Sequence, residues 1–265
     1  MSLTESGAAL EPPSPAIRRF IIAEIIIVLG VSLGRSAVYS IIAIIDRLTQ
    51  ATPLGEQSTS MNVSVTPDRP WLDLAYQLYY FILPLAQVAL VLYLLHLAYG
   101  QGRRLIGFDL TNPGKDLLKG AGLLVAIGIP GLGFYLLARY IGINTTVSPA
   151  NLTSQWWTVP VLLGSAAMAG LSEETIMLGY LITRLKTLGW HPAWAIVVSA
   201  LIRGSYHLYQ GFGGFLGNLV MGLAFGALFL KWKRVTPFIV THFLLDAFAF
   251  VGYSLLAPYL TWLTG

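Results

Sequence analysis

The sequence contains no cysteine, and this absence excludes several kinds of chemistry. Without a thiol the chain can form no disulfide, use no thiolate nucleophile and bind no metal through sulfur. The absence does not assign a cellular compartment. Any catalytic or metal-binding chemistry must therefore use other side chains.

Charged residues are also scarce. They make up only 11% of the 265 residues, whereas about 25% is usual in globular proteins. Hydrophobic residues make up 55%, and the mean hydropathy is +0.69. Because so few charges could not cover a water-exposed surface, lipid must be the solvent for most of the chain. We therefore predict an integral, multi-pass membrane protein instead of the one or two soluble domains that this length would suit.

Long apolar runs define the predicted fold. Residues 1–16 are polar and rich in proline, which predicts a disordered N-terminal tail, and residues 17–265 are predicted to form a single all-α transmembrane helical bundle. About seven runs come near the ~20 residues that a membrane-spanning helix needs. They cover residues 18–45, 71–98, 120–141, 158–185, 192–209, 214–231 and 235–262. The basic stretch 101–119 is interpreted either as a cytoplasmic interfacial segment or as a plain loop.

The basic residues are sorted to alternate ends of the predicted spans. One set of ends carries Arg18, Arg19, Arg103, Arg104, Lys115, Lys119, Arg184, Lys186, Lys231, Lys233 and Arg234. The opposite ends carry Arg47, Arg69 and Arg139. Since Lys and Arg concentrate in cytoplasmic loops, the pattern predicts a cytoplasmic N-terminus and an external C-terminus. It also accounts for the net charge of +4 without a nucleic-acid partner.

The membrane itself is predicted from what the sequence does not show. We expect a bacterial plasma membrane, because no organelle-targeting segment is recognised. For a eukaryotic relative the endoplasmic reticulum is the alternative.

Ionisable side chains inside the predicted spans are the most informative feature of the sequence. Each costs at least ~2.5–3.5 kcal/mol in a membrane helix, so each is a candidate functional residue. The first span contains Glu24 and Arg35. The last four spans contain Glu173, Glu174, Arg203, His207, His242 and Asp246. Their concentration in the fourth, fifth and seventh spans predicts a site in the second half of the chain.

Spacing groups these side chains on helix faces. Glu173 and Glu174 are adjacent and point about 100° apart on a helix, so one can face a catalytic centre while the other makes a structural contact. Two further pairs are four residues apart and share a face: Arg203 with His207, and His242 with Asp246. A carboxylate with imidazoles in a wet pocket can activate water as a general base, and it can also bind a divalent metal.

Each of these residues also has a purely structural interpretation. The glutamate pair could form salt bridges with Arg35 or Arg203 and fix the packing of helices. A single histidine in a span commonly makes an interhelical hydrogen bond. Two carboxylates, two imidazoles and an aspartate in three nearby spans are harder to explain by packing alone. The other two histidines, His96 and His191, fall at span ends and are predicted to be interfacial.

Three short motifs carry these residues. They are Glu-Glu-Thr-Ile-Met-Leu-Gly-Tyr-Leu from Glu173 to Leu181, Arg-Gly-Ser-Tyr-His from Arg203 to His207, and His-Phe-Leu-Leu-Asp from His242 to Asp246. In order and internal spacing they resemble the CPBP family of intramembrane proteases, which includes CAAX proteases and Abi proteins. The family pattern is Glu-Glu-x-x-x-Arg, usually followed by Gly-Tyr-Leu, then Phe-x-x-x-His and His-x-x-x-Asn or Asp. The resemblance predicts a CPBP-like catalytic core at about residues 155–250, of the bacterial branch.

The chain departs from this family pattern at two positions. Leu178 stands at the arginine position of the first motif, and Arg203 replaces the phenylalanine of the second. We interpret this as a cation that has moved between spans, so that Arg203 compensates the charge of Glu174. The alternative is a branch of the family that has lost peptidase activity.

The resemblance implies a role for each motif residue. Glu173 would be the general base and would activate a water together with His207. His242 and Asp246 would stabilise the oxyanion, or His242 would polarise the scissile carbonyl.

The resemblance also bears on supporting residues and on cofactors. Glu174 and Arg203 would support the site from behind. The family has been described both as metal-dependent and as glutamate-dependent without metal, and we expect no cofactor here. If zinc or another divalent metal is bound, its predicted ligands are Glu173, His207 and His242.

The leading functional prediction is an intramembrane endopeptidase that hydrolyses a peptide bond of a membrane-associated protein or peptide. Its expected partners are the lipid bilayer and that substrate. Two other functions could use the same residues: a transporter with a proton or ion relay, and a non-enzymatic membrane scaffold of the same fold. For His207 to meet the other motif residues, the short fifth span must either start deep in the membrane or end inside the protein, and the segment 210–214 could supply a buried bend.

Overall fold

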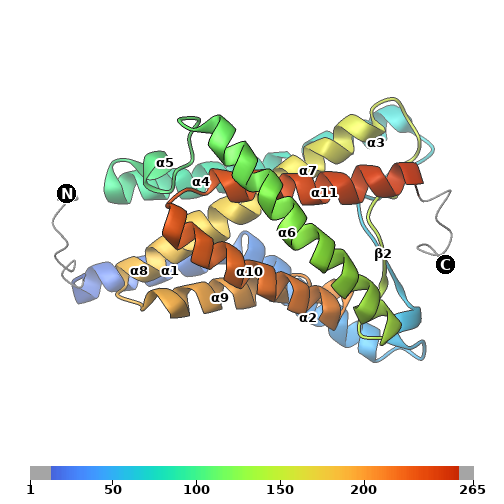
Figure 1. The fold of residues 1–265 in the computed structure, drawn as a ribbon, viewed down its shortest axis with the longest axis horizontal. Helices are drawn as coiled ribbons and strands as arrows, with labels where there is room; N and C mark the ends of the chain where they lie inside the picture. The colour runs from blue at the N-terminus through green and yellow to red at the C-terminus, as the bar shows by residue number, and fades with distance from the viewer. Residues whose placement is uncertain (1–12, 257–265) are drawn as a thin grey trace.

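The structure, a computed structural model, describes residues 13–256. Most of these residues are helical (Figure 1). The helices are α1 (Pro15–Gly30), α2 (Leu33–Leu48), α3 (Pro70–Tyr79), α4 (Ile82–Tyr99), α5 (Gly102–Leu105), α6 (Pro113–Tyr140), α7 (Thr158–Glu174), α8 (Thr183–Thr187), α9 (Pro192–Ser205), α10 (Phe212–Trp232) and α11 (Thr236–Leu256). The remaining elements are the 3₁₀ turns η1 (Leu54–Glu56) and η3 (Leu208–Gln210), the π-helical segment η2 (Thr175–Ile182), and the strands β1 (Ser58–Ser60) and β2 (Thr146–Ser148). The predicted all-α membrane bundle is confirmed.

Most of the predicted spans are long enough to cross a membrane. Five helical stretches of the described chain are long and apolar enough: Pro70–Tyr99, Pro113–Tyr140, Thr158–Thr187, Phe212–Trp232 and Thr236–Leu255. The pair α1 and α2, bent by 54°, makes a sixth. The other predicted span, 192–209, holds the 14-residue helix α9. At about 21 Å long, α9 is shorter than the ~30 Å hydrocarbon core, so this span ends inside the protein.

Two predicted boundaries differ from the structure. Helix α1 begins at Pro15, inside the predicted tail 1–16, because Ser14 Oγ caps it by accepting a hydrogen bond from the amide of Ile17 at 3.4 Å. The rest of that tail, residues 1–12, and the predicted helix end after residue 256 lie outside the described residues. Helix α6 begins at Pro113, so the second part of the stretch 101–119 belongs to a span.

A serine and a glycine break the first span between α1 and α2. Ser32 Oγ donates a hydrogen bond to the carbonyl of Val28 at 2.6 Å, and a Cβ on Gly34 would lie only 2.7 Å from a carbonyl oxygen of α1. Such Gly and Ser positions are common sites of helix kinks. The bend brings α2 next to the turn after α9, where Ser40 Oγ donates to the carbonyl of Tyr206 at 2.9 Å.

The largest apolar core surrounds η2. The side chains of η2 from Ile176 to Ile182 are fully buried, and they pack with residues of α1, α4, α9, α10 and α11. Ser199 on α9 donates to the carbonyl of Met177 at 2.9 Å and so provides a partner for a backbone group of the π-helical segment. Segments of π-helix occur often beside functional sites, and this one directly follows the glutamate pair.

Two loops meet beyond one end of the helices and form a small cap, which we define as residues 57–66 and 143–153. Within it β1 and β2 pair in parallel, with Ser58 opposite Thr146. In Figure 1 the cap, marked by β2, lies at the opposite end of the molecule from the start of α1 and from α5. The strands were not predicted, because two polar strands of three residues give no alternating hydrophobic pattern.

A charged clasp closes the loops at the other end. Arg234, between α10 and α11, donates to Asp116 at 2.6 Å and to Asp109 at 3.0 Å. The hydroxyl of Thr111 and the Arg234 guanidinium lower the pKa of Asp109 to about 2. These contacts tie the loop before α6 to the loop before α11.

Candidate active site

The glutamate pair lies at the end of α7, where three predicted spans meet. Glu174 is fully buried, and its Oε2 accepts a hydrogen bond from Arg203 Nη2 on α9 at 2.7 Å. Its Oε1 lies 2.6 Å from His242 Nδ1 on α11. Each buried charge thus has a partner, which offsets the large cost of removing ions from water. Glu174 therefore ties α7, α9 and α11 together.

Glycines let these helices approach closely. A Cβ on Gly170 of α7 would lie 3.0 Å from the backbone of α11, and a Cβ on Gly222 of α10 would lie 2.9 Å from the Cα of Ala200 on α9. Small residues at such contacts are typical of helix packing in membranes. The close packing brings the polar side chains of different spans within hydrogen-bonding range.

Glu173 has different partners from Glu174, as two adjacent helical residues should. Its Oε2 accepts a hydrogen bond from the hydroxyl of Tyr206 at 2.6 Å. Arg203 Nη1 lies 3.8 Å and His207 Nε2 lies 3.9 Å from the same oxygen. Tyr206 is not among the predicted site residues. Its signal was available, because a tyrosine hydroxyl buried in a span needs a hydrogen-bond partner.

His207 lies in the turn between α9 and η3. Its two ring nitrogens are buried and have no hydrogen-bond partner among the described residues. The 3.9 Å between Nε2 and Glu173 Oε2 is too long for a hydrogen bond. A buried polar group left without a partner indicates a place for a water or for part of a substrate.

The turn after His207 is held by the cap. Gly211 has a φ of +118°, and a Cβ there would lie 2.7 Å from the carbonyl oxygen of Ile143. Only glycine tolerates both conditions. The carbonyl of Gln210 accepts hydrogen bonds from the amide and the hydroxyl of Thr145, each at 2.9 Å. The bend predicted at 210–214 is therefore present, and it brings His207 to the depth of the glutamates.

His242 stands between two carboxylates. Its Nδ1 faces Glu174 at 2.6 Å, and its Nε2 lies 3.5 Å from Oδ2 of Asp246, one turn further along α11. A ring nitrogen can hydrogen-bond a carboxylate only as an N–H donor. The predicted pairing of His242 with Asp246 on one helix face is observed.

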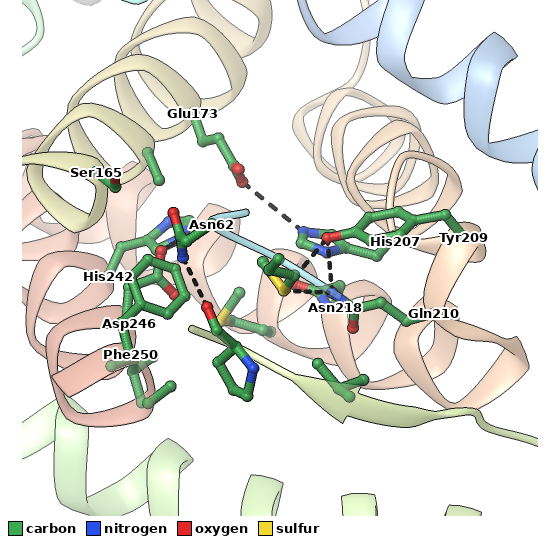
Figure 2. Close-up of a pocket in the computed structure, with 17 residues that line it drawn as sticks. Asn62, Ser165, Glu173, His207, Tyr209, Gln210, Asn218, His242, Asp246 and Phe250 are labelled. Carbon is green, nitrogen blue, oxygen red and sulfur yellow. Dashed lines mark hydrogen bonds and ion pairs between the residues drawn. The ribbon is translucent and has the colours of Figure 1, made fainter. Parts of the chain in front are cut away.

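A cavity of about 400 Å³ lies beside these side chains (Figure 2). All four predicted catalytic residues line it, namely Glu173, His207, His242 and Asp246. The two predicted supporting residues, Glu174 and Arg203, are buried behind its wall. The structure thus brings the six motif residues together from three spans.

Uncharged polar side chains outside the predicted set of site residues also line the cavity. They are Asn62, Ser165, Tyr209, Gln210 and Asn218, all labelled in Figure 2. The hydroxyl of Tyr209 accepts a hydrogen bond from Gln210 Nε2 at 2.9 Å and donates to the sulfur of Met61 in the cap at 3.7 Å. Uncharged polar residues are common in spans, so their types alone gave no signal.

The other intramembrane charges lie apart from the site. Glu24 pairs with Arg184 at 2.6 Å and accepts a hydrogen bond from the hydroxyl of Tyr180 at 2.8 Å. Arg35 is exposed and forms no ion pair with the described residues. Of the two cations that could have paired with the glutamates, Arg203 is the one that does.

The chemistry of the donor set can be tested against a metal ion. Ligand atoms of Glu173, Glu174 and His242 lie within 4.8 Å of one another, and oxygen and imidazole nitrogen suit zinc. Both oxygens of Glu174 are engaged, however, by Arg203 at 2.7 Å and by His242 at 2.6 Å. A metal bound to Glu174 would lie beside the positive charge of the Arg203 guanidinium, which disfavours a second cation, so this arrangement does not favour one. The predicted zinc set, with His207 in place of Glu174, stays a prediction.

A comparison with known families gives an independent result. The family model described as type II CAAX prenyl endopeptidase Rce1-like matches residues 155–248. The matched segment contains all three motifs and has nearly the bounds of the predicted catalytic core. No curated protein and no solved structure matches the chain significantly. Through residues 155–248, about a third of its length, the chain is thus similar to CAAX-type intramembrane proteases.

Proposed function

We propose that the protein hydrolyses a peptide bond of a membrane-associated protein or peptide, with Glu173 and His207 activating the attacking water. One observation carries this proposal. Glu173 Oε2 and His207 Nε2 face each other across 3.9 Å at the cavity wall, and neither ring nitrogen of His207 has a hydrogen-bond partner among the described residues. A carboxylate beside an unpartnered imidazole in a cavity is an arrangement suited to general-base catalysis.

The gap between the two side chains suits a bridging water. A water about 2.8 Å from each atom forms a triangle on the 3.9 Å base, with an angle of roughly 90° at the water. Such a water can donate one proton to the carboxylate while it contacts the imidazole. The hydroxyl of Tyr206, 2.6 Å from the same carboxylate oxygen, holds Glu173 in this orientation.

The reaction is a direct attack of this water on the scissile carbonyl. The water oxygen bonds to the carbonyl carbon, one water proton passes to Glu173, and the π electrons move to the carbonyl oxygen. When the tetrahedral intermediate collapses, the C–N bond breaks and its electrons stay on nitrogen. The nitrogen takes the proton from Glu173, so the products are a carboxyl and an amino terminus and the base is regenerated.

We assign His242 to the developing oxyanion. Its Nδ1 lies 2.6 Å from an oxygen of Glu174 and its Nε2 lies 3.5 Å from an oxygen of Asp246, so a ring with a proton on each nitrogen would have a carboxylate beside each N–H and would carry a positive charge at the cavity wall. A fixed positive charge in a site of low dielectric stabilises the negative charge that develops on oxygen. Asp246 orients the ring, because an ionised carboxylate has no proton to offer the oxyanion.

The apolar core supports hydrolysis over an ion relay. A transporter needs polar groups on both sides of the glutamate pair. On one side, the side chains from Ile176 to Ile182 are fully buried and, except for the tyrosine at 180, carry no polar group. An ion that reached Glu174 would therefore have no polar route onward through η2.

The test compares variants in liposomes with a quenched library of membrane peptides, with cleavage followed by mass spectrometry. Glu173→Gln keeps the size of the side chain and removes the base, so we expect cleavage to fall by about 10²–10⁴-fold. Glu56→Gln, the same change at an exposed position outside the cavity, serves as the matched control and should cleave like wild type. Cleavage by wild type and by Glu56→Gln should persist in a metal chelator.

Two outcomes would count against the proposal. Equal cleavage by wild type and Glu173→Gln would show that another group is the base. An absence of cleavage by correctly folded wild type would favour a non-enzymatic scaffold of the same fold.

A further inference from the structure

The cavity extends from the catalytic residues in one direction along the helices. On α7 its wall is formed by Ser165, Ala169 and Glu173, which share one face and lead back toward the N-terminal end of that helix. On α11 it continues from Asp246 to Phe250, toward the C-terminal end. In Figure 1 this end of α11 lies on the same side of the molecule as β2. The cavity therefore runs from the glutamates toward the cap.

The cap completes the wall at that end. Met61, Asn62, Val147 and Pro149 all line the cavity, and Figure 2 shows strand and side chains of the cap beside the catalytic residues. Asn62 Nδ2 donates to the carbonyl of Pro149 at 2.7 Å, which joins the two loops of the cap over the cavity. A molecule that enters from this end meets the cap and then the site.

In the opposite direction the protein is closed. No residue between Glu173 and His207, and none between Met221 and His242, lines the cavity. These intervals contain η2, whose side chains are fully buried in the apolar core. The Arg234 clasp lies beyond that core and ties two loops together. A peptide arriving from this end would have to open this apolar core.

The distribution of charge assigns the two ends to the two sides of the membrane. The cap end carries Arg47, Arg69 and Arg139, and Arg47 is used within the structure, since it donates to Gln57 and to the carbonyl of Ser58 at 3.2 Å. The clasp end carries the other basic residues of the loops, from Arg18 to Arg234. Because basic loops are cytoplasmic, the cap end is extracytoplasmic.

From the cavity, the core and the charges together, we infer that the active site opens to the extracytoplasmic side. Its substrate is then a membrane-anchored peptide whose scissile bond is exposed on that side. The cavity wall combines apolar side chains such as Leu245 and Phe250 with the amides of Asn62 and Asn218. This mixture fits a largely apolar peptide segment that also needs hydrogen-bond partners for its backbone. The substrate class rests on the proposed function, whereas the direction of opening does not.

The absence of cysteine permits a direct test with single-cysteine variants of the full chain in intact cells. Ser165→Cys, a nearly isosteric change, reports on the cavity. Ser60→Cys reports on the cap and Lys186→Cys on the opposite end, and both positions are exposed. A small, charged, membrane-impermeant methanethiosulfonate reagent is added outside, and the thiols that remain are counted with a biotin maleimide after denaturation.

We expect Ser60→Cys and Ser165→Cys to react in intact cells, and Lys186→Cys to react only after permeabilisation. Reaction of Lys186→Cys from outside, with Ser60→Cys protected, would reverse the orientation and overturn the inference. A Ser165→Cys thiol that reacts only from the cytoplasmic side, or from neither side, would overturn the direction of opening.

A second arm separates this inference from the proposed function. Glu173→Gln in the Ser165→Cys background should show the same labelling, because access does not need catalysis. Correct labelling without cleavage by wild type would reject the proposed hydrolysis alone. Cleavage of peptides presented only to the Lys186 side of oriented proteoliposomes would reject the extracytoplasmic substrate and leave the hydrolysis standing.

Discussion

Tyr206 makes the shortest contact to the proposed general base, 2.6 Å to Oε2 of Glu173, whereas Arg203 and His207 lie 3.8 and 3.9 Å from that oxygen. The hydroxyl is therefore the group that fixes the carboxylate. Tyr206→Phe removes this donor and keeps the ring. A hydrogen bond to a charged group contributes about 1.5–3 kcal/mol, so we expect kcat to fall about 10–150-fold with little change in KM, measured by steady-state kinetics.

Tyr180→Phe is the matched control for this prediction. Its hydroxyl also donates to a carboxylate, that of Glu24 at 2.8 Å, but it lies in the apolar core away from the cavity. This variant should lose stability and keep its kcat. If both substitutions lowered kcat equally, the effect would come from packing in general, and Tyr206 would have no specific positioning role.

The ion pair between Arg203 on α9 and Glu174 on α7 replaces an ion pair that the family pattern would form within a single helix. That pattern has an arginine at Leu178, one turn after Glu174, and here Leu178 is buried in the core. The cation comes instead from α9, where Arg203 Nη2 lies 2.7 Å from Glu174. Arg203→Phe leaves that carboxylate with His242 alone, and breaking a buried pair costs about 3–5 kcal/mol. We expect a clearly lower unfolding midpoint in detergent.

A double variant tests whether the cation has moved between spans. Leu178→Arg alone puts a charge into the core and should destabilise the protein. Combined with Arg203→Phe it should recover most of the lost stability, because the new guanidinium is within reach of Glu174 one turn away. A double variant no more stable than Arg203→Phe would contradict the relocation.

Elements differ in how far the sequence could predict them. The helices and the four predicted catalytic residues could be predicted because the free energies involved are large. An apolar segment in lipid must pair all its backbone polar groups, which a helix does, and an ionisable side chain in a span is costly unless it has a function. The cap could not be predicted, because β1 and β2 pair loops that are far apart in the chain, as in the contact between Thr59 and Thr145, 86 residues apart. The residue type of Tyr206 indicates a hydroxyl that needs a partner, but its contact with Glu173 could not be predicted, since Tyr206 follows the end of α9, where helical spacing no longer fixes direction.

In the molecule as a whole, the segment that carries the chemistry depends on the segment before it. The family match covers residues 155–248, yet the core around η2 also contains Ile21, Ile25 and Val28 of α1 and Val91 and Leu95 of α4. The far wall of the cavity comes from the cap. The first half of the chain therefore supplies packing and enclosure for motifs that lie in the second half.

The contact between Glu24 and Arg184 tests this dependence. Arg184 donates two hydrogen bonds to the Glu24 carboxylate, at 2.6 and 2.9 Å, and so joins α1 to α8 within the core. Glu24→Gln keeps the shape and leaves a buried guanidinium without its counter-ion, so the free energy of unfolding should fall by about 1–3 kcal/mol. Unfolding in mixed micelles, followed by tryptophan fluorescence, measures this loss against Glu56→Gln, which should leave stability unchanged. Because Glu24 does not line the cavity, kcat/KM of the folded protein should stay the same. A loss of kcat/KM at full stability would instead mean that the first span acts on the site itself.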